Sequence, residues 1–123
     1  MTVLAAVDEG DGSTSVVQRG HELATAFDEE LVVLHVEPET ESLDAAESVA
    51  ADAIRAALDD REGVTAVGAL GDSSTRILRE ADERDVRYVV LGPRKRTPVG
   101  KALMGSVAQL VVLNADRPVV LTD

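Results

Sequence analysis

The sequence predicts a doubly wound α/β fold, with one five-stranded parallel sheet flanked by four helices. Strand-like apolar runs alternate along the chain with segments of helical periodicity, and this alternation is typical of parallel strands joined by right-handed crossovers. Several strand-like runs are almost continuously apolar, as expected for strands that helices cover on both faces. The 123 residues, 45% of them apolar, are sufficient for one core, so we expect a single domain over residues 1–123.

The expected strands and helices follow one another in regular order. Runs of β-branched and aliphatic residues predict five strands. These runs are Val3 to Val7, Leu31 to Val36, Val64 to Leu70, Arg87 to Leu91, and Val119 to Leu121. Apolar stripes at helical spacing predict the four helices between them, the third with Asp72 as its N-cap. The stripes are Val16, Val17, Gly20, Leu23, Ala24 and Phe27; Leu43, Ala46, Ala50, Ala53, Ile54, Ala57 and Leu58; Ile77, Leu78 and Ala81; and Val107, Leu110 and Val111.

Residues 92–106, here called the basic segment, concentrate positive charge on an acidic chain. They read GPRKRTPVGKALMGS and hold four of the twelve basic residues and none of the 23 acidic ones. The four are Arg94, Lys95, Arg96 and Lys101. Such segregation is typical of a site for an anionic ligand. The alternative is a solvated surface loop whose cations pair with the acidic body.

The basic segment leads from the fourth strand into the helix that begins at Gly105-Ser106. Free backbone N–H groups and the positive end of the helix dipole favour phosphate at such a helix start. In a doubly wound sheet the ligand crevice opens at the carboxyl ends of the strands, where the winding reverses. If the first and fourth strands are neighbours, the loop Asp8 to Ser13 faces the basic segment there.

Asp8 directly follows the first strand, which predicts two roles that stay open. Its carboxylate can accept hydrogen bonds from a ribose or a base edge while the basic segment holds phosphates. Alternatively, Asp8 caps the first helix or forms an Asx turn with the glycines that follow. With Glu9 and Asp11 it also offers oxygen ligands for Mg²⁺ or Mn²⁺ bound through a nucleotide's phosphates.

Composition argues against several classes of protein. A chain without cysteine has no disulfide, thiolate nucleophile or cysteine-ligated metal, and two histidines argue against a histidine-built metal site. A net charge of −11 argues against nucleic acid and anionic membranes as partners. No apolar run reaches the roughly 20 residues that span a bilayer. We therefore expect a cytoplasmic protein with no metal site of its own.

The sequence contains no recognisable catalytic set. Neither histidine is expected near enough to activate Ser106, because His35 is predicted to be a core residue at a strand end and His21 a half-exposed helical one. Gly100-Lys101 is not a P-loop, since that register needs Gly at position 95 and Ser or Thr at 102. We expect a binding protein rather than an enzyme, with a slow ATPase as the alternative.

Taken together, these motifs resemble the universal stress protein family, whose nucleotide-binding members carry the pattern G-x2-G-x9-G-[ST] after the fourth strand. Gly92 and Gly105-Ser106 stand at the required spacing, while Lys95 occupies the second glycine position. The resemblance extends over the whole chain. Its other parts are Val7-Asp8 with Gly12-Ser13, His35-Val36, Gly71, and Arg117-Pro118-Val119-Val120.

The resemblance implies a Rossmann-like fold and a stress-response role with bound ATP, ADP or AMP. It implies base and ribose contacts from Ala6, Asp8 and Val36, and phosphate contacts from Gly92, Gly105, Ser106 and Val107. Arg94 and Lys95 are expected to add cationic contacts. Lys95 can instead fill the phosphate volume, which leaves a dimeric interaction module without nucleotide as the alternative.

A homodimer is also expected, through the last strand. The run Pro118 to Thr122 is apolar and reaches almost to the end of the sequence, so it is suited to an exposed sheet edge that needs cover. The resemblance to universal stress proteins also implies pairing of last strands across a twofold axis.

The acidic surplus, with two Lys against ten Arg, is typical of proteins from a high-salt cytoplasm, and we expect an extreme halophile as the source. Salt screens the self-repulsion that destabilises a compact acidic chain. We predict that the midpoint of thermal unfolding at neutral pH rises as salt increases from about 0.1 M to about 1 M, where the screening length falls from about 10 Å to about 3 Å. Circular dichroism melts check this. A midpoint that is independent of salt would contradict it.

Overall fold

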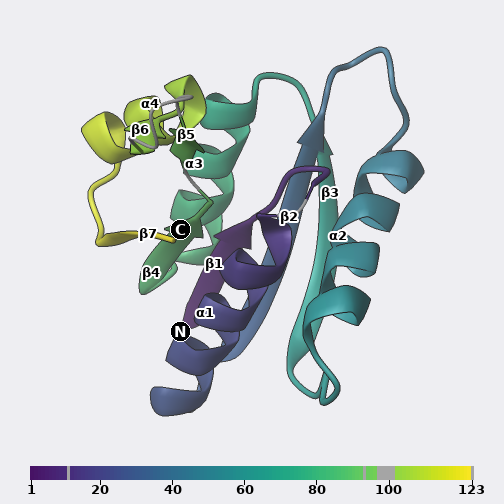
Figure 1. The fold of residues 1–123 in the computed structure, drawn as a ribbon, viewed down its shortest axis with the longest axis vertical. Coiled ribbons are helices and arrows are strands. Elements are labelled where there is room, and N and C mark those ends of the chain that lie inside the picture. Colours follow the sequence, from purple (N-terminus) through teal and green to yellow (C-terminus); the bar gives the residue numbers. More distant parts are fainter. Residues whose placement is uncertain (11, 93, 97–101, 123) are drawn as a thin grey trace.

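A computed structural model describes residues 1–10, 12–92, 94–96 and 102–122, with the backbone alone at 94–96 and 102–104. It confirms the doubly wound α/β fold (Figure 1). The main sheet consists of β1 (Thr2–Ala6), β2 (Glu30–Glu37), β3 (Val64–Leu70), β4 (Tyr88–Leu91) and β7 (Val119–Leu121). The helices are α1 (Ser13–Ala26), α2 (Leu43–Ala57), α3 (Ser73–Arg84) and α4 (Ser106–Asn114). Among the described residues, no helix is long and apolar enough to cross a membrane.

The main sheet has the strand order β3-β2-β1-β4-β7, and all neighbouring strands are parallel. β1 is central: Ala6 lies opposite Leu34 of β2 on one side and Leu91 of β4 on the other. The first and fourth strands are therefore neighbours, which is the condition under which the loop after β1 faces the basic segment. Because the winding reverses between them, the carboxyl ends of β1, β2 and β4 meet where a doubly wound fold binds its ligands.

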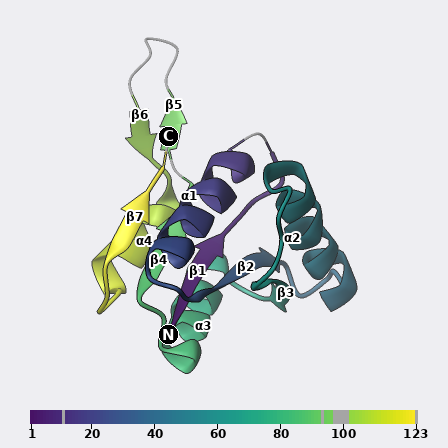
Figure 2. The ribbon, with the colours of Figure 1, turned by 90° about the horizontal axis from the view of Figure 1, so that it is seen from below.

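Alternating side chains of the central strands divide the core between the two faces of the sheet. On one face, α1 and α2 cover Val3, Ala5, Val7, Leu31, Val33 and Val90. On the other face, α3 and α4 cover Leu4, Val32, Leu34, Val89 and Leu91. Figure 2 shows α1 and α2 on one side of the sheet and α3 on the other. The same alternation directs Val36 to the α3/α4 face and its neighbours His35 and Glu37 to the α1/α2 face.

Gly68 of β3 brings α2 close to the sheet beside His35, its partner in the β2–β3 register. A Cβ atom at this position would lie 2.5 Å from the backbone nitrogen of Glu47 and 2.8 Å from the carbonyl oxygen of Leu43. Glycine is therefore needed here for the close approach of α2 rather than for its backbone conformation. The helix in turn helps to bury the end of β2.

The basic segment is not the continuous loop that the sequence predicted. Within it, β5 (Arg94–Arg96) and β6 (Ala102–Met104) pair as antiparallel strands, with Lys95 opposite Leu103. Figure 2 shows this pair standing out from the main sheet. Strands of three residues are too short for a recognisable alternation of apolar and polar side chains, which explains why they were not expected.

The apolar stripe Val107, Leu110 and Val111 was expected to face the core from α4, but only part of it is buried. Val111 is fully buried, as is nearly all of Ala108, whereas Val107 and Leu110 are 37% and 47% exposed. The helix has only nine residues and packs beside α3 at the edge of the sheet, so one side of it suffices for the core. In the first stripe, Phe27 lies beyond the end of α1 and is exposed.

Candidate functional site

A cavity of about 250 Å³ opens at the carboxyl edge of the sheet. The ends of β1, β2 and β4 form its floor, and the first turns of α3 and α4 border it. Its lining residues are Ala6, Val7, Asp8, Leu34, Val36, Ser73, Ile77, Leu91, Gly92, Gly105, Ser106, Val107 and Ala108. A smaller hollow of about 120 Å³ shares Ala6, Asp8 and Gly92 with it and continues to Gly10, Gly12 and Ser13. Together the two spaces approach the size of small-molecule sites, roughly 300–1,000 Å³.

The cavity brings together seven of the nine residues predicted to bind a ligand. These are Ala6, Asp8, Val36, Gly92, Gly105, Ser106 and Val107. The other two, Arg94 and Lys95, belong to β5, and their side chains lie outside the described part of the structure. Asp11, Pro93 and Lys101 also lie outside the described residues.

The start of α4 offers backbone donors to the cavity. The first hydrogen bond of this helix runs from the Gln109 N–H to the Gly105 carbonyl. The N–H groups of Ser106, Val107 and Ala108 precede it, and helix geometry gives them no partner within the helix. Because the N-cap is Gly105, the N-cap residue provides no side chain to cap this helix. The free donors and the positive end of the helix dipole therefore favour an anion beside Ser106.

The four helices differ in whether a side chain caps their first turn. The Ser42 hydroxyl caps α2, and the Asp72 carboxylate caps α3. Hydrogen bonds from the backbone N–H of Thr75, its hydroxyl and the Ser74 hydroxyl hold the pKa of Asp72 below its usual value. By contrast, α1 begins at Gly12 without a side-chain cap. Both uncapped helices, α1 and α4, begin at the two hollows; α3 also begins at the larger one, but Asp72 caps it.

Asp8 does not cap α1, because the N-cap of that helix is Gly12. Instead the buried Ser13 hydroxyl donates a hydrogen bond to the Asp8 backbone carbonyl. This bond closes the loop after β1 and leaves the Asp8 side chain exposed beside the cavity. The structure thus overturns the capping interpretation of Asp8, while its predicted ligand contact stays a prediction.

Sequence reasoning missed the remaining lining residues, and only some of them had a usable signal. Leu34 and Leu91 have the same alternation in their strands as Val36 and Val89, so the cavity face could have been assigned from the strand pattern. Ser73 and Ile77 come from α3, whose position over this edge depends on tertiary packing and leaves no local signal.

The strand-end histidine is buried, as predicted: His35 is 5% exposed. Its Nδ1 lies 2.7 Å from the Val7 carbonyl oxygen and its Nε2 lies 2.7 Å from Glu37 Oε1. His21 is half-buried on α1, again as predicted. Neither residue lines the cavity.

Comparison with known proteins identifies the family. The pattern of the Universal stress protein family matches residues 1–123. The structure of a universal stress protein from Archaeoglobus fulgidus superposes with a TM-score of 0.77 at 30% identity, covering 100% of this chain and 98% of that one. A structure from the same organism in complex with dAMP gives a TM-score of 0.70 at 25% identity, with 100% and 98% coverage.

A curated universal stress protein from Mycolicibacterium smegmatis is 44% identical over 48 residues. This match spans 39% of the chain and little more than a third, 37%, of the mycobacterial protein. The family pattern, in contrast, covers every residue from the first strand to the last. The chain belongs to the universal stress protein family.

Proposed function

We propose that this chain is a regulatory protein of the stress response that binds an adenine nucleotide in the cavity at the ends of β1, β2 and β4. The observation that carries the proposal is the uncapped start of α4, which presents three backbone donors beside Ser106. An anionic group is the partner that such donors favour. The dAMP complex of the Archaeoglobus protein supports an adenine nucleotide as its source.

The lining of the cavity suits the two ends of a nucleotide. Val36, Ile77 and Leu91 offer apolar surface to a base, while the exposed Asp8 carboxylate can accept hydrogen bonds from ribose hydroxyls. Gly92 lies at the other end, where a Cβ atom would lie 2.8 Å from Val16 Cγ2, so glycine allows the end of β4 to pack against α1. In this arrangement the phosphates lie between Gly92 and the first turn of α4.

Binding without turnover is the activity that this lining favours. Among the described residues around the cavity, Asp8 is the one ionisable side chain. General acid/base chemistry needs a positioned donor and acceptor with suitable pKa values, and a lone exposed carboxylate does not provide both. Mg²⁺ or Mn²⁺ carried by the phosphates is compatible with the proposal, with Asp8 as an oxygen ligand.

Changing Ser106 to Asp tests the phosphate position. A carboxylate in the first turn of α4 is favourable for the helix but repels a phosphate at the same donors. Calorimetric titration with ATP and AMP in molar salt should show saturable binding to the wild type and a loss of at least about tenfold in Ser106→Asp. Gln109→Asp is the matched control, because it adds the same charge at an exposed position that does not line the cavity. Equal affinities in all three proteins would contradict the proposed phosphate position.

Lys95 separates the proposed function from a second one, a dimeric interaction module without nucleotide. If Lys95 is a phosphate ligand, its replacement by Gly weakens ATP binding more than AMP binding, because fewer charges are engaged in AMP. If Lys95 closes the site, the wild type does not bind and Lys95→Gly does. The same calorimetric titration distinguishes the two, and failure of both proteins to bind would reject the nucleotide function.

We also propose a homodimer that uses the β7 edge and the exposed side of α4. β7 is an edge strand of the main sheet, and Leu110, Val112 and Leu113 are 47%, 40% and 72% exposed on α4. Light scattering at micromolar concentration in high salt should give twice the chain mass of 13.0 kDa. A charge in the covered apolar patch is costly, so Leu113→Glu should shift the protein toward the monomer. A wild-type mass of one chain would reject the dimer.

A further inference from the structure

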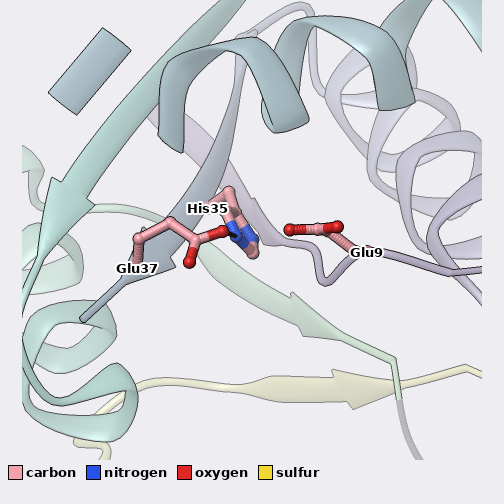
Figure 3. Close-up of side chains that lie close together, drawn as sticks. All are labelled: Glu9, His35 and Glu37. Atoms are coloured by element: carbon pink, nitrogen blue, oxygen red, sulfur yellow. Dashed lines mark hydrogen bonds and ion pairs between the residues drawn. The ribbon is translucent and has the colours of Figure 1, made fainter. Parts of the chain in front are cut away.

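His35, Glu37 and Glu9 form a cluster on the face of β2 opposite the cavity. One nitrogen of His35 and one carboxylate oxygen from each glutamate lie within 4.8 Å of one another. Figure 3 shows the His35 ring between the two carboxylates, with Glu37 from the end of β2 and Glu9 from the loop after β1. His35 is buried, Glu37 is half-buried and Glu9 is exposed. The cluster is therefore reachable from solvent on the Glu9 side.

Hydrogen bonding fixes which nitrogen of His35 is available. Its Nδ1 lies 2.7 Å from the Val7 carbonyl oxygen, and a carbonyl can only accept, so Nδ1 carries a proton. In the neutral ring, Nε2 then presents a lone pair. That lone pair points at Glu37 Oε1 from 2.7 Å, where an ionised carboxylate is also an acceptor. A cation held between them, either a proton on Nε2 or a metal ion, satisfies both acceptors.

We propose that this cation is a divalent metal ion, Zn²⁺ in the first instance, bound by His35 Nε2 and the carboxylates of Glu9 and Glu37. Imidazole with two carboxylates is a donor set that Zn²⁺ accepts, and water completes the four ligands. The Nδ1–H bond to a backbone carbonyl is the orientation that metal-binding histidines usually have. Two histidines in the sequence argue against a site built from histidines alone. Here two carboxylates and one histidine would provide the protein ligands.

The distances allow the ion with a small adjustment. Ligand atoms around a tetrahedral Zn²⁺ with bonds of about 2.0–2.1 Å are about 3.4 Å apart, so Nε2 and Glu37 Oε1, which lie 2.7 Å apart, must separate by about 0.7 Å to admit the ion. Glu9 is exposed, so rotation of its side chain can shorten its separation from the other two ligand atoms. This site is separate from Mg²⁺ or Mn²⁺ bound through phosphates, since its three protein ligands bind the ion without a nucleotide.

The ion would join the loop after β1 to the end of β2. Glu9 follows Asp8, and His35 and Glu37 flank Val36, so each ligand is a direct neighbour of a residue that lines the cavity. Fixing Glu9 therefore restricts the backbone that carries Asp8. The site would act as a clamp on one wall of the cavity without contacting its contents.

Calorimetric titration of the nucleotide-free full chain with ZnCl₂ tests this site, in high salt to screen nonspecific binding to the acidic surface. We expect one ion per chain in the wild type. Glu9→Gln and Glu37→Gln keep the side-chain shapes but remove one ligand charge each, and each should weaken binding by at least about tenfold. Glu39→Gln and Glu41→Gln are matched controls, because both residues are exposed and nearby and neither belongs to the cluster.

A second readout follows Co²⁺ by its visible absorption, which distinguishes a four-coordinate site from the hydrated ion. We expect a one-to-one spectrum in the wild type and in the two control variants, and its loss in Glu9→Gln, whose exposed position makes it the variant least able to disturb folding. Weak binding of several ions with the same affinity in all five proteins would mean adventitious binding to acidic surface and would overturn the proposal. The titration uses no nucleotide, so its result is independent of whether the cavity binds one.

Discussion

The central position of β1 is the constraint on which the rest of the structure depends. β1 pairs with β2 and β4, and its residues Val3, Leu4 and Ala5 are completely buried. A strand covered on both faces and paired on both edges can expose polar groups only at its ends. At its carboxyl end, the loop that carries Asp8 meets the end of β4 and the start of α4. At this edge the starts of α1 and α4 have no capping side chain, whereas Ser42 and Asp72 cap α2 and α3.

The same constraint explains which features were predictable from the sequence. The apolar runs that form β1, β2 and β4 are almost continuous and buried, so their identity as parallel strands followed from pattern and fold rules. The resemblance to universal stress proteins, through the glycine spacing from Gly92 to Gly105, implied a ligand site at these residues, and both line the cavity. These features are local in sequence or follow from the alternation of strands and helices.

The features that were missed depend on tertiary packing. Ser73 and Ile77 reach the cavity because α3 crosses its edge, and nothing in the composition of α3 indicates this. Val107 and Leu110 share a helical face with Val111 in sequence, yet α4 needs only one side for the core at the sheet edge. The approach of Glu9 to His35 likewise joins residues from different elements, and a single sequence provides no signal for that contact.

The backbone of Val7 joins the end of β1 to β2 beside the site. Its N–H donates to the Leu34 carbonyl at 2.8 Å, and its carbonyl accepts from His35 Nδ1 at 2.7 Å. Both bonds lie immediately before Asp8, so β2 fixes the start of the loop. The remaining conformational freedom lies in the backbone of Asp8 and Glu9. An ion on Glu9 and a nucleotide on Asp8 would thus order the same few backbone bonds from opposite faces. If ordering by one lowers the entropic cost of binding the other, the coupling must be reciprocal, and each ligand must raise the affinity of the other by the same factor.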